Sequence, residues 1–77
     1  MTRYDYDTIR AKALHPDATA EDRIALMEWL DAYDASAWNG EYYDIDDGLR
    51  LYPIEKPIAF EDDGTPYEWE YVDAEVR

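Results

Sequence analysis

The sequence contains no cysteine, a single histidine and a single serine among its 77 residues. Without cysteine, disulfide bridges and thiol chemistry are excluded, which is compatible with a cytoplasmic location. His15 and Ser36 lie on separate expected connecting segments, and nothing near either residue predicts an oxyanion hole. We therefore expect a protein that is not an enzyme and that uses neither a cofactor nor a metal.

Long apolar runs are also absent. No stretch approaches the roughly 18 apolar residues that a membrane-spanning helix requires. The first residues lack the apolar region of a signal peptide. The sequence thus predicts a soluble, cytoplasmic protein.

Basic residues are scarce. Seven Lys and Arg face 20 Asp and Glu, which gives a formal net charge of −13. Small soluble domains are usually designed with a net charge of magnitude about 2 to 8, and a larger charge destabilises the fold by self-repulsion. Direct binding to nucleic acid or to anionic membranes is disfavoured, because both require basic residues. A basic protein surface is the partner that this charge favours.

Hydrophobic residues make up 47% of the chain and aromatic residues 16%, which is enough to fold one small domain over residues 1–77. Apolar residues recur with helical spacing over residues 6–14 and 20–34. Thr19 is a suitable N-cap for the second helix, and His15-Pro16 ends the first.

Beyond Asn39-Gly40 the apolar spacing changes from helical to alternating. Asp-Asp-Gly occurs twice, at residues 46–48 and 62–64, and predicts two hairpin turns. Pro53 and Pro57 predict a connector between the hairpins, because proline interrupts a central strand. The expected strands are residues 41–45, 49–54, 58–61 and 67–72. The fold class is α+β, with two N-terminal helices packed on an antiparallel sheet of three to four strands.

Both layers are expected to supply the core. Tyr67, Trp69 and Tyr71 alternate with Glu68 and Glu70, so we expect the aromatic side chains to be buried and Trp69→Ala to unfold the domain. The other expected core residues are Ile9, Ala13, Ile24, Met27, Leu30, Tyr33, Tyr43, Ile45, Leu49, Leu51 and Phe60.

The outer face of the sheet is the candidate partner-binding surface. Carboxylates two residues apart on a strand are separated by about 6.6 Å, so an array of them can imitate the phosphates of a nucleic acid. An ordinary solvated face is the alternative interpretation. The candidate residues are Asp44, Asp46, Asp47, Glu61, Asp62, Asp63, Glu68 and Glu70, with Tyr42 and Tyr52 between them.

Two other hypotheses remain open. Asp44, Asp46 and Glu55 fall at positions one, three and twelve of an EF-hand loop, but Gly48 falls at five, where such a loop has glycine at six. A hairpin turn therefore explains this segment better than a calcium site. The third hypothesis is a small adaptor or dimer that uses an exposed aromatic patch around Trp29, Trp38 and Tyr52. We expect a monomer.

The segments Trp38-Asn39-Gly40-Glu41-Tyr42-Tyr43-Asp44 and Leu49-Arg50-Leu51-Tyr52-Pro53-Ile54 resemble short, uncharacterised acidic proteins of bacteriophages and mobile elements. In size and charge the chain also resembles phage-encoded anti-CRISPR inhibitors, several of which are acidic mimics of nucleic acid. This resemblance implies an inhibitor that binds the basic nucleic-acid-binding surface of a host defence protein, such as a CRISPR effector. It carries over no individual binding residue.

Overall fold

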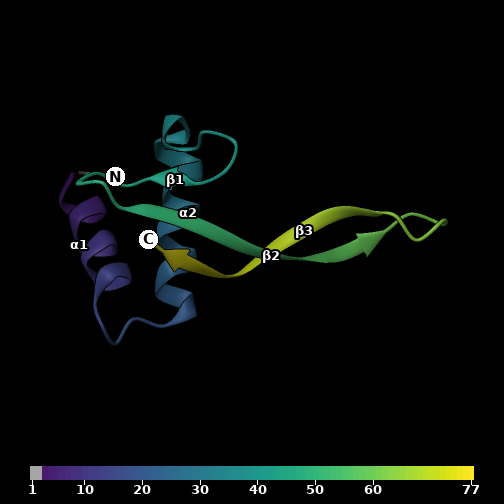
Figure 1. Cartoon of the computed structure of the whole chain (residues 1–77), viewed down its shortest axis with the longest axis horizontal. Coiled ribbons are helices and arrows are strands. Elements are labelled where there is room, and N and C mark those ends of the chain that lie inside the picture. The colour runs from purple at the N-terminus through teal and green to yellow at the C-terminus, as the bar shows by residue number, and fades with distance from the viewer. Residues whose placement is uncertain (1–2) are drawn as a thin grey trace.

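A computed structural model describes the backbone of residues 3–77 and the side chains of residues 5–77. Two helices precede a three-stranded antiparallel sheet with the strand order β1-β2-β3, which confirms the predicted α+β class and its two hairpins (Figure 1). The elements are α1 (Arg3–Leu14), α2 (Ala20–Tyr33), a 3-10 turn η1 (Ala35–Ala37), β1 (Tyr43–Asp44), β2 (Arg50–Phe60) and β3 (Pro66–Val76).

Helix α2 begins at the predicted cap. The Thr19 hydroxyl accepts a hydrogen bond from the backbone N–H of Asp22, and the Asp22 carboxylate accepts one from the backbone N–H of Thr19. This reciprocal pair satisfies two N–H groups that the helix itself leaves unbonded. The helix then buries Leu26, Met27 and Leu30 against α1 and the sheet. The remaining buried core residues are Tyr6, Ala13, Tyr43, Ile45, Leu51 and Ala74.

Both Asp-Asp-Gly segments form the predicted turns. In the first, Asp46, Asp47 and Gly48 all have positive φ, at 78°, 55° and 76°. In the second, Gly64 has a φ of 90°, and its N–H donates to the Glu61 carbonyl. Asp and Gly are among the residues that accept this left-handed conformation best, which is why the motif stops a strand at both places.

The predicted connector between the hairpins was wrong, because β2 runs unbroken through Pro53 and Pro57 for 11 residues. On β2, only Arg50 and Leu51 pair with β1, so within residues 3–77 no strand lies along the outer side of β2 beyond that point. Arg50 and Arg77 exchange both backbone hydrogen bonds at 2.8 Å, and alternation from this pair turns the nitrogen of residues 53 and 57 toward the free outer edge. Each proline lacks an N–H only where no strand would accept it.

The far half of the β2–β3 hairpin projects from the body as a two-stranded arm, which we define as residues 56–70 (Figure 1). It gives the molecule extents of 44 × 26 × 23 Å. No residue of the arm is buried. The predicted burial of Phe60, Tyr67 and Trp69 was therefore wrong, since their exposed fractions are 54%, 62% and 52%. Tyr33, also expected in the core, is 60% exposed.

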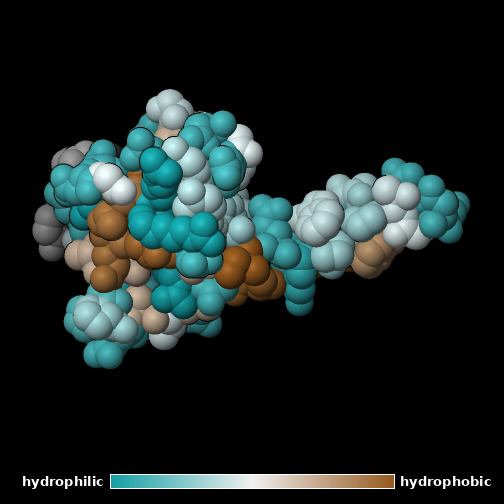
Figure 2. Space-filling model, in the orientation of Figure 1, coloured by the Kyte–Doolittle hydropathy of each residue, from teal (hydrophilic) through white to brown (hydrophobic). Residues whose placement is uncertain are grey.

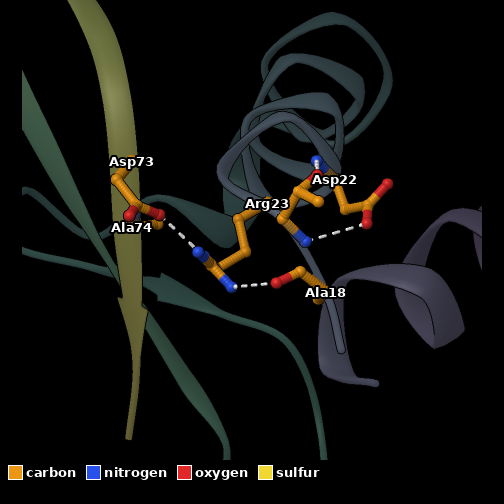
Figure 3. A network of polar contacts seen from close by, with 6 residues as sticks. Ala18, Asp22, Arg23, Asp73 and Ala74 are labelled. Carbon is orange, nitrogen blue, oxygen red and sulfur yellow. Dashed lines mark hydrogen bonds and ion pairs between the residues drawn. The ribbon is translucent and has the colours of Figure 1, made fainter. Parts of the chain in front are cut away.

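The near half of the hairpin is fixed to α2 by polar contacts. The Arg23 guanidinium donates to the Asp73 carboxylate at 2.7 Å and to the Ala18 carbonyl at 3.2 Å, so one side chain joins α2, β3 and the segment before α2 (Figure 3). The bond from Arg23 holds the pKa of the Asp73 carboxyl below its ordinary value. Tyr71, the β3 residue that directly follows the arm, donates its hydroxyl hydrogen to Asp31 of α2 at 2.8 Å. The arm thus starts from a fixed base.

Candidate partner-binding surface

The arm concentrates negative charge away from the helices. Residues 56–70 contain five carboxylates and one basic residue, Lys56. Ile58, Phe60, Tyr67 and Trp69 are large hydrophobic residues that lie exposed on the same segment. Figure 2 shows the arm as a narrow, mostly hydrophilic projection. The five carboxylates are Glu61, Asp62, Asp63, Glu68 and Glu70.

The two faces of the arm differ in chemistry. Cross-strand partners share a face, and neighbours along a strand point to opposite faces. Lys56 pairs with Glu70, and the Lys56 ammonium lies 3.2 Å from the Glu70 carboxylate. Pro57 pairs with Trp69, which puts the indole on the face opposite Glu68 and Glu70. The arm therefore presents carboxylates on one side and an aromatic ring on the other.

The tip of the arm is a turn whose carboxylates lie exposed to solvent. Glu61 donates its N–H to the Thr65 carbonyl at 2.9 Å, which closes the turn. The Asp63 carboxylate accepts the Thr65 N–H at 2.9 Å, and this bond lowers the pKa of Asp63. Glu61, Asp62 and Asp63 are all exposed. The turn holds three adjacent anions at the end of the projection.

The single acidic array expected from the sequence does not form. Asp44 pairs with Arg50 at the first residue of β2, whereas Glu61 follows the last. A strand of 11 residues spans about 35 Å at the usual rise, so these two carboxylates lie at opposite ends of the molecule. The structure brings together the candidates on the arm. It separates from them the candidates in the body, which are Asp44, Asp46, Asp47, Tyr42 and Tyr52.

Two of the body candidates hold the first turn against α1. The Arg10 guanidinium donates to the Ile45 carbonyl at 3.0 Å and lies 3.5 Å from the Asp47 carboxylate. The Tyr6 hydroxyl donates to the Asp46 carboxylate at 3.4 Å. These contacts connect residues about 35 to 40 positions apart in the chain. Asp46 and Asp47 therefore have a structural role, which the sequence pattern did not reveal.

Tyr42 and Tyr52 are also engaged within the chain. Their rings lie 5.2 Å apart, with the Arg50 guanidinium 4.8 Å from the Tyr42 ring and the Arg77 guanidinium 4.6 Å from the Tyr52 ring. Two cations thus flank the pair by cation–π contacts. The register of β1, β2 and β3 brings these arginines onto the two rings, and the sequence alone does not give that register.

The calcium hypothesis lacks a ligand set in the described part of the chain, where no three His, Cys, Asp or Glu side chains cluster closely enough to hold a metal ion. Asp44 lies in β1 and pairs with Arg50 at the start of β2, whereas Glu55 lies five residues further along β2 and pairs with Tyr71 of β3. These two residues therefore do not belong to one loop.

His15 and Ser36, the residues considered for nucleophilic catalysis, each form a hydrogen bond with a residue two positions away. His15 accepts the Asp17 N–H at 3.0 Å, and Ser36 donates to the Asp34 carboxylate at 2.7 Å.

The aromatic patch expected for an adaptor divides into separate contacts. Trp29 packs on Tyr6 and Tyr33 with ring centroids 4.9 and 5.3 Å apart. Trp38 packs on Tyr43, and Tyr52 on Tyr42. On the arm, by contrast, Phe60, Tyr67 and Trp69 are exposed, although they were expected in the core.

No protein-family model matches this chain, and neither the curated proteins nor the solved structures include a match to it. Among the described residues, neither helix has the length and apolar character needed to cross a membrane.

Proposed function

We propose that this chain is a non-enzymatic inhibitor that inserts its acidic arm into the nucleic-acid-binding groove of a basic partner protein. The observation that carries the proposal is the arm itself, because it presents five carboxylates and an exposed Trp69 on a projection with no buried residue. In size and charge the whole chain resembles phage anti-CRISPR inhibitors. A host defence protein such as a CRISPR effector is therefore the proposed class of target.

The chemistry of the arm fits grooves that hold single-stranded nucleic acid. Such grooves combine Lys and Arg residues, which follow the phosphates, with aromatic platforms on which bases stack. Glu68 and Glu70 stand on one face at the spacing of alternate strand residues, about 6.6 Å. Trp69 offers a flat ring on the other face. One narrow element thus supplies substitutes for both phosphates and bases.

The body supports this function by positioning the arm. Arg23 and Asp31 fix the base of β3 through Asp73 and Tyr71. The body also uses its own basic residues internally, since Arg10, Arg23, Arg50 and Arg77 each contact an acidic or aromatic side chain. Within the arm, Lys56 is the one basic residue beside the five carboxylates.

The test begins with capture of host nucleic-acid-binding proteins on the immobilised chain, followed by competition with nucleic acid on each purified target. We expect the target to release labelled single-stranded nucleic acid as this protein is added, and less efficiently at 300 mM than at 50 mM salt, because the encounter is electrostatic. Glu68→Gln with Glu70→Gln is expected to weaken inhibition at least tenfold.

A matched control separates the arm from the overall charge. Glu28→Gln with Glu41→Gln removes the same two charges from exposed positions of the body. We expect this control to inhibit almost as well as the wild type. If the two double variants lose inhibition equally, the effect depends on net charge and not on the arm. A ternary complex of target, nucleic acid and inhibitor would overturn the mimic proposal.

A further inference from the structure

The two outer edges of the arm are unequal. On β2, Pro53 and Pro57 turn their nitrogens toward the outer edge, so this edge offers no N–H at either position. Proline on an edge strand blocks the addition of another strand. The β2 edge is closed to strand pairing.

The edge of β3 carries no such protection. No proline occurs between Tyr67 and Val76. Trp69 pairs with Pro57, and because Pro57 has no N–H, this pair does not exchange ladder hydrogen bonds. The backbone N–H and C=O of Trp69 therefore point outward, away from β2. Tyr71, two residues further along the same strand, repeats this orientation.

The helices leave this part of the edge uncovered. The contacts of β3 with α2 are made by Asp73 and Tyr71, near the base of the hairpin. From Pro66 to Glu70 no residue is buried, and Figure 1 shows this stretch extending away from both helices.

We infer that the outer edge of β3 between Pro66 and Tyr71 accepts an extended segment of the partner protein as an added strand, with Lys or Arg at alternate positions. The inference rests on the proposed function for the class of partner, and it adds the backbone contact by which the partner is held. Strand addition obtains affinity from main-chain hydrogen bonds and specificity from alternate side chains. Glu68 and Glu70 would meet the basic side chains, and Trp69 the apolar ones on the opposite face.

Two copies of this chain would repel one another if their β3 edges paired about Trp69. A two-fold antiparallel pair centred on Trp69 would place Glu68 of one copy opposite Glu70 of the other. Like charges directly opposite one another destabilise paired strands. The carboxylates that attract a basic strand therefore also oppose self-association.

The probe is a fluorescein-labelled peptide of alternating Lys and Val, compared by fluorescence anisotropy with the same peptide N-methylated at every backbone nitrogen. N-methylation keeps the charge and removes the N–H groups from both edges of the peptide strand. We expect the protein to bind the unmodified peptide at least tenfold more tightly than the N-methylated peptide. We also expect the amide of Trp69 to gain hydrogen-exchange protection in the complex.

Variants of Trp69 separate backbone from side chain. Trp69→Pro is expected to abolish binding by closing the edge as Pro57 closes its own, whereas Trp69→Ala keeps the N–H and is expected to lose less than tenfold. The circular dichroism spectrum of each variant checks its fold, and the N-methylated peptides test the edge even if Trp69→Pro is misfolded.

The outcomes distinguish this inference from the proposed function. Equal binding of unmodified and N-methylated peptides, lost on Glu68→Gln with Glu70→Gln, would overturn the strand addition and leave the acidic surface in place. Binding that ignores both modifications would overturn both, as would no binding at all at low salt. A dimer in sedimentation that Trp69→Pro dissociates would make the second copy the occupant and overturn the inference.

Discussion

Acidic residues of this chain serve different purposes according to what lies beside them. Asp31 accepts hydrogen bonds from the hydroxyls of Tyr43 and Tyr71, at 2.5 and 2.8 Å, and the two hydroxyl oxygens lie 2.6 Å apart. Burial and then the bond to Asp31 raise the pKa of the Tyr43 hydroxyl above its ordinary value. Burial likewise raises the pKa of Tyr71. A carboxylate here connects α2, β1 and β3, whereas the carboxylates of the arm are exposed.

This cluster predicts a loss of stability at alkaline pH. An unfolded tyrosine ionises near pH 10, but folded Tyr43 keeps its proton beyond that point, so above pH 10 the unfolded state binds fewer protons. The free energy of unfolding should then fall by up to about 1.4 kcal/mol per pH unit for this residue. Urea melts of the wild type and of Tyr43→Phe between pH 8 and pH 11 test it. The variant is expected to show the shallower decline, and parallel declines would contradict the assignment.

At the scale of elements, the sequence predicted what local rules determine. Helical spacing and the Thr19 cap located α2 at Ala20–Tyr33, and the Asp-Asp-Gly segments located both turns. The continuity of β2 was missed because proline disrupts a strand that has neighbours on both sides, and at Pro53 and Pro57 β2 has a neighbour on one side only. That follows from the short length of β1, which the sequence near the prolines does not indicate.

Burial on the hairpin was the larger error, and it has the same origin. Alternation along Tyr67–Tyr71 shows which residues share a face but not whether another layer covers that face. Tyr71 lies under α2, and Tyr67 and Trp69 extend past it. The candidate carboxylates near the tip were found together because they are close in sequence, whereas Asp44, Asp46 and Asp47 are held apart from them by the length of β2.

Because Trp69 lies on the exposed arm, Trp69→Ala is expected to destabilise the protein much less than the sequence predicted. Trp69 is 52% exposed, so we expect its truncation to lower the free energy of unfolding by about 1 kcal/mol or less. Leu51, fully buried where β2 meets β1, is the matched position in the body, and Leu51→Ala is expected to cost about 2 to 5 kcal/mol. Urea midpoints of both variants give the comparison. A Trp69→Ala variant as unstable as Leu51→Ala would show that the arm folds back onto the body.

At the scale of the molecule, the arm holds its acidic residues at a distance from the acidic residues of the body. The body pairs Arg10 with Asp47 and Arg23 with Asp73, so part of its charge is compensated locally. The arm holds five acids against Lys56 alone. In a molecule 44 Å long, placing these anions at one end increases their distance from the acids of the body. Repulsion across and along the arm itself remains.

This arrangement predicts that moderate salt stabilises the protein. At 10 mM ionic strength the Debye length is about 30 Å, comparable with the whole molecule, and at 100 mM it is about 10 Å. We expect the melting temperature to rise over this range, because the repulsion that accompanies a net charge of −13 is screened more than the close Arg23–Asp73 pair. A variant with Glu61→Gln, Asp62→Asn and Glu68→Gln should start from a higher melting temperature and gain less from salt. Thermal melts followed by circular dichroism at both salt concentrations measure the difference. If added salt lowers the melting temperature of the wild type, attractive ion pairs dominate its electrostatics, and the arm does not carry the uncompensated field from which its binding to a basic groove was inferred.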